Sequence, residues 1–317
     1  AVSPDWSKFR HCDDRSDDGR NCLVTSCGVM LRALLDGTVV PGQIRYGVCM
    51  DMRLIDPPLP LAGRVIALWS LQGAPQGLYS GLPKPHVEFI VSLSGDHAWQ
   101  ADAGSPPVSF RLGWVTPIQT APRFAQTHGR LHLIGARLSI QSAVALFGPA
   151  IQRDGATPVP LDALLGHEAA LLQEQLLGAQ DERQRMSMLC DWLQHRLMDC
   201  REIAMPTNQV LLEMRWRTDS LAEHMGLSPR GLRNRFHRQL GLSPKVWLRL
   251  HRFDAILSSG FSDTSLVDTA LTFGYSDQAH MSSDFRQFAG RSPTDYVSSR
   301  AVGDAPTAAP HFVPRTD

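Results

Sequence analysis

The chain has 317 residues, with 31 basic and 31 acidic side chains that give a formal net charge of zero. This length accommodates about two domains with a substantial buried core. A net charge of zero does not by itself point to any class of partner for the chain as a whole. No apolar run approaches the ~18 residues of a membrane-spanning helix, so we expect a cytoplasmic protein with no membrane partner.

Six cysteines occur at positions 12, 22, 27, 49, 190 and 200, without a Cys-x-x-Cys pair. Their irregular spacing does not indicate a disulfide framework. Four of them lie in the first 50 residues, where a zinc or redox site is conceivable. The spacing and the lack of partner histidines nevertheless favour ordinary thiols, and we expect neither a metal nor a cofactor.

No fold is predicted for residues 1–55, which mix acidic and short apolar pieces. Residues 56–203 are predicted to form a domain that senses a signal or dimerises. Its first part has the texture of β-strands, because short runs rich in β-branched and aromatic residues are separated by Gly/Pro/Ser clusters. These runs cover residues 64–69, 87–93, 131–134 and 135–140.

From residue 160 the apolar residues recur at helical spacing. The leucines from Leu161 to Leu176 predict one amphipathic helix, and the apolar positions from Met188 to Leu197 predict another. Residues 301–317 are rich in Ala and Pro and are predicted to be a disordered tail. The predicted fold class is α+β, with a β-rich N-terminal domain that also contains helices, followed by an all-α domain.

A repeat in the C-terminal section is the strongest pattern in the sequence. The segment from Leu221 to Ser228, LAEHMGLS, recurs from Thr269 to Ser276 as TALTFGYS, with the small alanine and the glycine at the same spacing. Each copy then runs to a Gly-x-Ser-Pro motif, at residues 241–244 and 290–293. The offset between the copies grows from 48 residues at the first glycine to 49 at the second, so the second copy contains one extra residue.

Each copy predicts a helix-turn-helix. Gly226 and Gly274 supply a left-handed turn at little steric cost, and Ser228 and Ser276 are predicted to cap the helix that follows. The inward stripes of the second helices are Leu232, Phe236 and Leu240, and Met281, Phe285 and Phe288. In this motif the second helix enters the major groove of DNA.

The polar face of the first such helix is basic. With Leu232 and Phe236 inward, the flank and the outer face carry Arg230, Arg233, Asn234, His237 and Arg238. Arginine and asparagine match the hydrogen-bonding edges of guanine and adenine. A solvated charged face is the alternative interpretation of such a basic run, but the two flanking turn patterns favour contact with DNA.

Residues 245–258 predict a connecting helix of about 14 residues and about 21 Å. Such a helix would hold the two units apart, so that one chain reads two major grooves about 34 Å apart on one face of the DNA. Arg249 and Arg252 would line it as phosphate contacts or as intramolecular pairs, and the sequence does not distinguish these alternatives.

Residues 221–245 and 273–293 resemble the DNA-binding domain of the AraC/XylS family of bacterial transcription regulators. The matching segments are LAEHMGLSPRGLRNRFHRQLGLSPK and FGYSDQAHMSSDFRQFAGRSP. The resemblance implies two helix-turn-helix units joined by a linker helix within residues 206–300. It also implies a sequence-specific transcription regulator and not an enzyme. The implied partners are double-stranded operator or promoter DNA, a small-molecule effector, a second copy of the chain and, for an activator, RNA polymerase.

The resemblance also implies residue roles. Base contacts fall at Arg230, Arg233 and Asn234 in the first unit. In the second unit the corresponding exposed positions are Gln278, Ser282 and Ser283, where many relatives carry arginine. The full set that we expect to contact DNA is Ser228, Arg230, Arg233, Asn234, His237, Arg238, Arg249, Arg252, Gln278, Ser282, Ser283 and Arg286.

The N-terminal part resembles, more loosely, an uncharacterised domain that precedes this DNA-binding domain in some family members. The similar segments are residues 57–62 leading to Trp69, residues 82–91 and residues 159–166. The resemblance implies a sensing or dimerising module and identifies no ligand.

Enzyme functions are the competing interpretations. His86 and Glu88 face the same side of a predicted strand, and with His97 or His132 they would form a metal site in a metal-dependent enzyme or a small-molecule-binding β-barrel. Ser276, His280 and Asp284 are the residue types of a hydrolase triad, but they share one helix and lack a nucleophile elbow. A third alternative, an adaptor that has lost DNA binding, is disfavoured by the intact basic helix.

Overall fold

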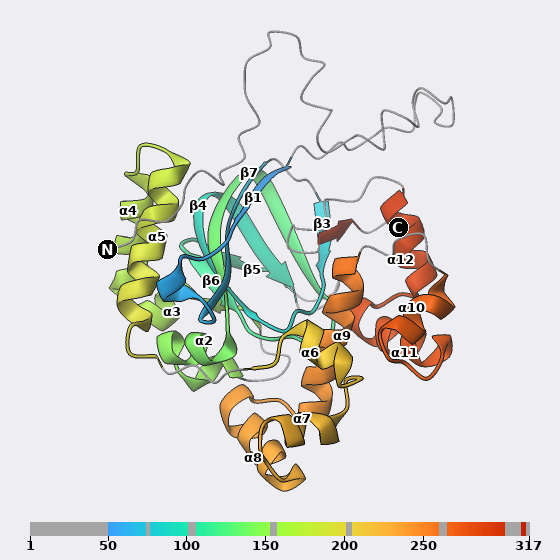
Figure 1. Cartoon of the computed structure of the whole chain (residues 1–317). Coiled ribbons are helices and arrows are strands. Elements are labelled where there is room, and N and C mark those ends of the chain that lie inside the picture. The colour runs from blue at the N-terminus through green and yellow to red at the C-terminus, as the bar shows by residue number, and fades with distance from the viewer. Residues whose placement is uncertain are drawn as a thin grey trace, which may run out of the picture.

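A computed structural model describes residues 50–73, 77–100, 106–152, 157–200, 205–259, 265–301 and 312–314 (Figure 1). The conceivable zinc or redox site at Cys12, Cys22, Cys27 and Cys49 lies outside these residues. Cys190 and Cys200 are free thiols. Burial raises the pKa of the Cys190 thiol to about 12, so this thiol is protonated and inert at neutral pH.

An antiparallel sheet forms the centre of the N-terminal domain. Its strands are β1 (Met50–Ile55), β2 (Val65–Gly73), β3 (Gly77–Gly81), β4 (Val87–Gln100), β5 (Val108–Phe110), β6 (Gly113–Thr116), β7 (Arg123–Leu138) and β8 (Val159–Pro160). The strand order is β1-β2-β7-β4-β6-β8, with β3 on β7 and β5 on β4. Strand β7 pairs with β2, β3 and β4, so it connects most of the sheet.

Successive side chains along a strand point to opposite faces of the sheet, and both faces of this sheet are apolar. One face contributes Leu68, Phe89 and Ile134 to the main core, and the other contributes Trp69 and Leu133 to a smaller aromatic cluster. The predicted strands 131–134 and 135–140 are one strand, β7. This strand ends at Leu138 because Ser139 caps the helix α2 (Ile140–Phe147) by accepting a hydrogen bond from the Ser142 backbone N–H.

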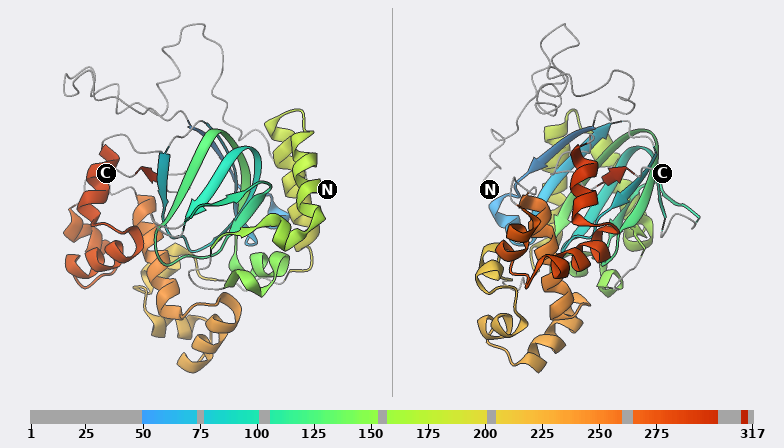
Figure 2. Two further views of the ribbon diagram at one scale, coloured as in Figure 1. Left: turned by 180° about the vertical axis from the view of Figure 1, so that it is seen from behind. Right: turned by 90° about the vertical axis from the view of Figure 1, so that its right-hand side faces the viewer.

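Helices of the N-terminal domain contribute to the main core together with the sheet. Figures 1 and 2 show them packed beside the sheet. They are α2, α3 (Leu161–Leu165), α4 (His167–Leu177) and α5 (Glu182–Leu197), with two short 3-10 helices, η2 (Leu59–Leu61) and η3 (Pro149–Gln152). The single helix predicted from Leu161 to Leu176 is two helices, α3 and α4, because the chain turns at Gly166 with a φ of 59°.

The C-terminal part is helical throughout the residues described between 205 and 301. It contains α6 (Asn208–Glu213), α7 (Thr218–His224), α8 (Pro229–Leu240), α9 (Pro244–Ser259), α10 (Leu266–Thr272), α11 (Gln278–Ala289) and α12 (Pro293–Ala301). The α+β fold class is confirmed, with a β-rich domain followed by an all-α one. The predicted connecting helix is α9, which extends one residue further at each end.

The tail differs from its prediction at three residues. Phe312–Pro314 form β9, which pairs antiparallel with β3. The prediction of a disordered tail is therefore wrong for these residues, because the free edge of β3 offers backbone partners that composition alone does not reveal. Across the described ranges, no helix is long and apolar enough to cross a membrane.

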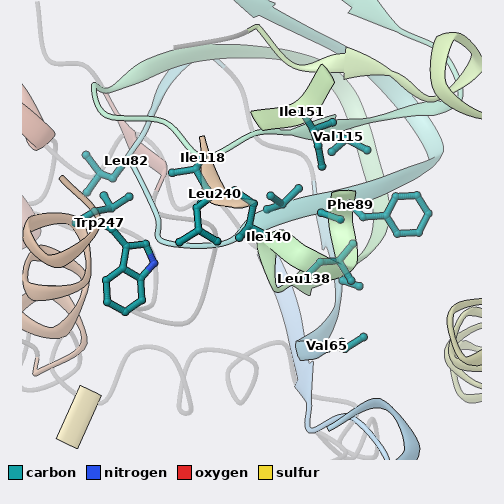
Figure 3. Close-up of a cluster of buried hydrophobic side chains, with 14 of the residues drawn as sticks. Val65, Leu82, Phe89, Val115, Ile118, Leu138, Ile140, Ile151, Leu240 and Trp247 are labelled. Atoms are coloured by element: carbon teal, nitrogen blue, oxygen red, sulfur yellow. The ribbon is translucent and has the colours of Figure 1, made fainter. Parts of the chain in front are cut away.

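The two parts of the chain share a continuous core. Leu82, Ile118 and Ile140 of the N-terminal domain belong to the same buried cluster as Leu240 of α8 and Trp247 of α9 (Figure 3). The α8–α9 corner is therefore packed directly on the end of the sheet and on α2.

Candidate nucleic-acid interface

Helices α7 and α8 form the first predicted unit. Ser228 caps α8 as expected, because its Oγ accepts a hydrogen bond from the Gly231 backbone N–H at 3.1 Å. Pro229 follows at the first helical position, where the missing N–H costs nothing. The predicted inward stripe is buried, at Leu232, Phe236 and Leu240.

The outer face of α8 presents the predicted DNA-contacting side chains to solvent. The exposed members are Ser228, Arg230, Arg233, Asn234, His237 and Arg238. Figure 1 shows α8 at the edge of the molecule, with α7 between it and α6. The remaining arginine of the helix, Arg235, is half-buried and donates from Nε to Gln239 Oε1 at 3.1 Å, so it lies off this face.

The second unit, α10 and α11, has a different turn. Asp277, not the predicted Ser276, caps α11, since its Oδ1 accepts from the His280 backbone N–H at 2.7 Å. This hydrogen bond lowers the pKa of the Asp277 carboxyl. The cap follows the turn glycine by two residues in the first unit and by three in the second. The extra residue of the second copy therefore lies in the turn.

The outer face of α11 is much less basic than that of α8. Gln278, Ser283 and Arg286 are exposed, and Ser282 is half-buried. The first arginine or lysine along the helix is Arg286, in its last turn. The two units therefore have the same helix-turn-helix arrangement but different exposed side chains.

Arg249 and Arg252 of α9 make contacts within the molecule. Arg249 Nη2 donates to Asp284 Oδ1 at 2.6 Å and to Gln287 Oε1 at 2.5 Å. Arg252 is 7% exposed, and its guanidinium lies 4.5 Å from the centre of the Tyr275 ring. Of the two alternatives that the sequence left open, the contacts favour intramolecular pairing for both arginines.

The buried carboxylate of Glu88 is already saturated by cations and donors. Its Oε1 accepts from Lys84 Nζ at 2.9 Å and Arg137 Nε at 3.2 Å, and lies 3.3 Å from His86 Nε2. Trp69 Nε1 donates to Oε2 at 2.9 Å. Burial alone would raise the pKa of Glu88, but these partners hold it well below its usual range. Glu88 therefore stays charged as the centre of an ion-pair cluster.

The histidines predicted to join His86 and Glu88 in a metal site lie elsewhere. His97 stacks on Trp114 at 4.2 Å in the aromatic cluster, and its buried Nδ1 has no hydrogen-bond partner in the described part of the chain. His132 Nε2 lies 3.2 Å from Glu182 Oε2 on the first turn of α5. No group of three potential metal ligands occurs among the described residues.

The hydrolase-like residues do not form a triad. Ser276 Oγ lies 3.1 Å from His280 Nδ1. Asp284, however, is buried and bonded to Arg249 and to the Tyr275 hydroxyl. Its carboxylate therefore connects α11 to α9.

The sequence does not indicate two further residues at this junction. Tyr275 and Gln287 complete the contacts of Arg249, Arg252 and Asp284. No sequence pattern pairs α9 with side chains this far along the chain, such as Gln287, which lies 38 residues beyond Arg249, so only the folded chain reveals them.

The helical domain is similar to known proteins. Residues 221–299 match the family model of a helix-turn-helix domain. The HTH-type transcriptional activator RhaS of Escherichia coli (strain SE11) is 32% identical over 130 residues, which is 41% of this chain. The match spans 40% of the length of that relative.

Two solved structures are also similar. ToxT from Vibrio cholerae has 9% identity and a TM-score of 0.40, with 78% of this chain and 98% of that chain covered. A probable AraC family transcriptional regulator from Rhodopseudomonas palustris CGA009 has 28% identity and a TM-score of 0.25, with 30% of this chain and 93% of that chain covered.

Proposed function

We propose that the protein is a sequence-specific DNA-binding transcription regulator of the AraC/XylS family. The match of residues 221–299 to a helix-turn-helix domain, and the similarity to a transcriptional activator, support this proposal. In this proposal α8 reads bases in a major groove, while α11 adds contacts in a second groove. The DNA-binding domain covers residues 206–300, and residues 56–203 form a domain that senses a small molecule or dimerises.

The observation that carries the proposal is the exposed basic face of α8. Arg233 and Asn234 project from a capped, well-packed helix and are exposed to solvent. Arginine and asparagine are the residues that pair with two atoms of guanine and adenine in the major groove. The neighbouring Arg230 and Arg238 add positive charge for the phosphate backbone, which supplies salt-dependent affinity without sequence preference.

The N-terminal domain is proposed to act by binding and not by catalysis. Glu88, which the metal-enzyme alternative requires, is committed to Lys84, Arg137 and Trp69. A titration of the protein with Zn²⁺, followed by dialysis and metal analysis, tests this point. Retention of one zinc per chain, lost on replacing both His86 and Glu88 by alanine, would contradict it.

Selection of bound sequences from a random DNA pool tests the proposed function. The full chain is expected to enrich a defined motif. A triple variant, Arg230→Ala, Arg233→Ala and Asn234→Ala, changes only exposed side chains, so it is expected to fold normally and to enrich no motif. An unenriched pool from the natural chain would contradict the proposal, as would an unchanged motif from the triple variant.

A further inference from the structure

A side chain of the N-terminal domain hydrogen-bonds to the last turn of α8. Gln152, at the end of η3, donates from Nε2 to the backbone carbonyl of Gln239 at 2.7 Å and to that of Arg238 at 3.4 Å. These carbonyls belong to the last four of the helix, which have no partner within it. A residue of the N-terminal domain therefore caps the C-terminal end of the first recognition helix.

The backbone approaches as closely as the side chain. Gly241 ends α8 in the left-handed conformation, with a φ of 69°. A Cβ at this position would clash with the carbonyl oxygen of Gln152. Ile151 and Leu240, the neighbours of these two residues, lie in the shared core (Figure 3). Because interiors are densely packed and yield little, η3 and the end of α8 must move together.

The second recognition helix also ends against the N-terminal domain, but without such a cap. Gly290 ends α11 with a φ of 72°, and a Cβ there would lie 3.3 Å from Pro122 Cγ. Its backbone N–H is bonded within α11, to the carbonyl of Arg286. Among the described residues, the hydrogen-bonded connection between the N-terminal domain and a recognition helix is thus made at α8.

The contact leaves the groove face of α8 open. Arg233, Asn234 and His237 are exposed while Gln152 holds the end of the helix. The contact therefore orients the helix without blocking it. Gln152 also lies at the end of the segment that leaves β7 through α2, so it is joined to the strand that connects most of the sheet.

We propose that Gln152 is a positioning residue for base reading: the N-terminal domain sets the angle of α8 through the two carbonyls that Gln152 caps. This inference rests on the proposed function, since it concerns the orientation of the helix that reads DNA. It predicts that loss of the cap weakens sequence discrimination by α8 and leaves discrimination by α11 unchanged.

The test uses the full chain and the DNA site selected from the random pool. The half-site of α8 is defined as the base pairs whose replacement changes the Kd of the natural chain but does not change the Kd of the Arg233→Ala variant. Discrimination is the ratio of the Kd for a site altered there to the Kd for the natural site, measured by fluorescence anisotropy. The same ratio is measured for a site altered in the other half.

Two variants of Gln152 remove the cap, and a third replaces the amide with another hydrogen-bond donor. Gln152→Ala deletes the donor, and Gln152→Glu places a carboxylate at the negative end of the helix dipole. Each is expected to lower discrimination at the α8 half-site about three- to ten-fold, the range of one net hydrogen bond. Gln152→Lys supplies a donor and a favourable charge and is expected to stay within about twofold of the natural chain. Gln175→Ala, on the exposed side of α4, is the matched control.

The outcomes separate this inference from the proposed function. Equal losses of discrimination at both half-sites would indicate a general structural defect and would overturn the positioning role of Gln152. Unchanged or improved discrimination in Gln152→Ala would also overturn it, since the contact would then be irrelevant or inhibitory. A natural chain that selects no sequence would refute the proposed function itself, and this inference with it.

Discussion

Arg249 on α9 and Asp284 on α11 form an ion pair in which Nε and Nη2 both donate to Oδ1, at 3.0 and 2.6 Å. The other carboxylate oxygen accepts from the Tyr275 hydroxyl at 3.3 Å. Asp284 is 4% exposed, so these partners take the place of water around its carboxylate. The pair attaches the second helix-turn-helix unit to the linker helix.

Removal of Asp284 should destabilise the protein. Asp284→Ala leaves Arg249 without its main partner and is expected to lower the free energy of unfolding by about 3–5 kcal/mol. Asp219→Ala, at a largely exposed position on α7, is the control and should change it by less than about 0.5 kcal/mol. Urea unfolding followed by circular dichroism gives both values, and equal small losses would show that the pair contributes little.

Arg249 and Arg286 should differ in the salt dependence of DNA binding. Arg286 is exposed on α11, so Arg286→Ala is expected to reduce the slope of log Kd against log salt by about 1, as for the loss of one phosphate contact. Arg249 is engaged by Asp284, so Arg249→Leu should leave this slope unchanged. A reduced slope for Arg249→Leu would reassign this side chain to the DNA.

Arg233 is expected to carry base specificity. Arg233→Ala should weaken binding to the selected site by about 1–3 kcal/mol and relax specificity at one base pair. Arg111→Ala, at an exposed position of the N-terminal domain, is the matched control. Gel-shift titrations with the selected and a scrambled site measure both effects, and an unchanged Kd for the selected site would remove Arg233 from the reading face.

His97 should make the fold sensitive to acid. Burial lowers its pKa from 6.5 to about 4, so the unfolded chain binds a proton before the folded one does. The free energy of unfolding has its full value above pH 6.5 and decreases as the pH falls towards 4. The decrease due to His97 amounts to about 2 kcal/mol by pH 5. His97→Phe keeps an aromatic ring beside Trp114, and it should flatten this part of the stability profile.

Thermal unfolding of both proteins between pH 7.5 and pH 5 measures the difference. The mutation also removes the buried Nδ1 that has no partner in the described residues, so the variant should be at least as stable at pH 7.5. Parallel pH profiles for the two proteins would show that His97 does not titrate in this range.

Local patterns were sufficient to predict the helical units. Ser228 caps α8 as its spacing from Gly226 indicates, and the inward stripes follow from helical periodicity. For α11 the sequence predicts Ser276 as the cap, whereas Asp277 caps the helix; the two residues are adjacent and both suit a cap. Only the backbone of the longer turn decides between them.

Contacts between distant segments could not be predicted in this way. Residues 131–134 and 135–140 are predicted as separate strands, but pairing of β7 with both β2 and β4 continues through Gly135. Likewise, the inward position of Arg252 depends on Tyr275, which reaches it from the neighbouring unit. In the N-terminal domain, the partners of Glu88 come from two other strands, β2 and β7, and from the loop before β4.

The longer turn before α11 also determines which residues of the two recognition helices are equivalent. Counted from the turn glycines, Gln278 corresponds to Arg230; counted from the caps, Ala279 does. One residue corresponds to about 100° of rotation around an α-helix. The two alignments therefore assign different sides of α11 to the surface that faces the DNA. Transplanting the α8 specificity into α11 therefore requires numbering from Asp277, with Ser282 and Ser283 taking the places of Arg233 and Asn234.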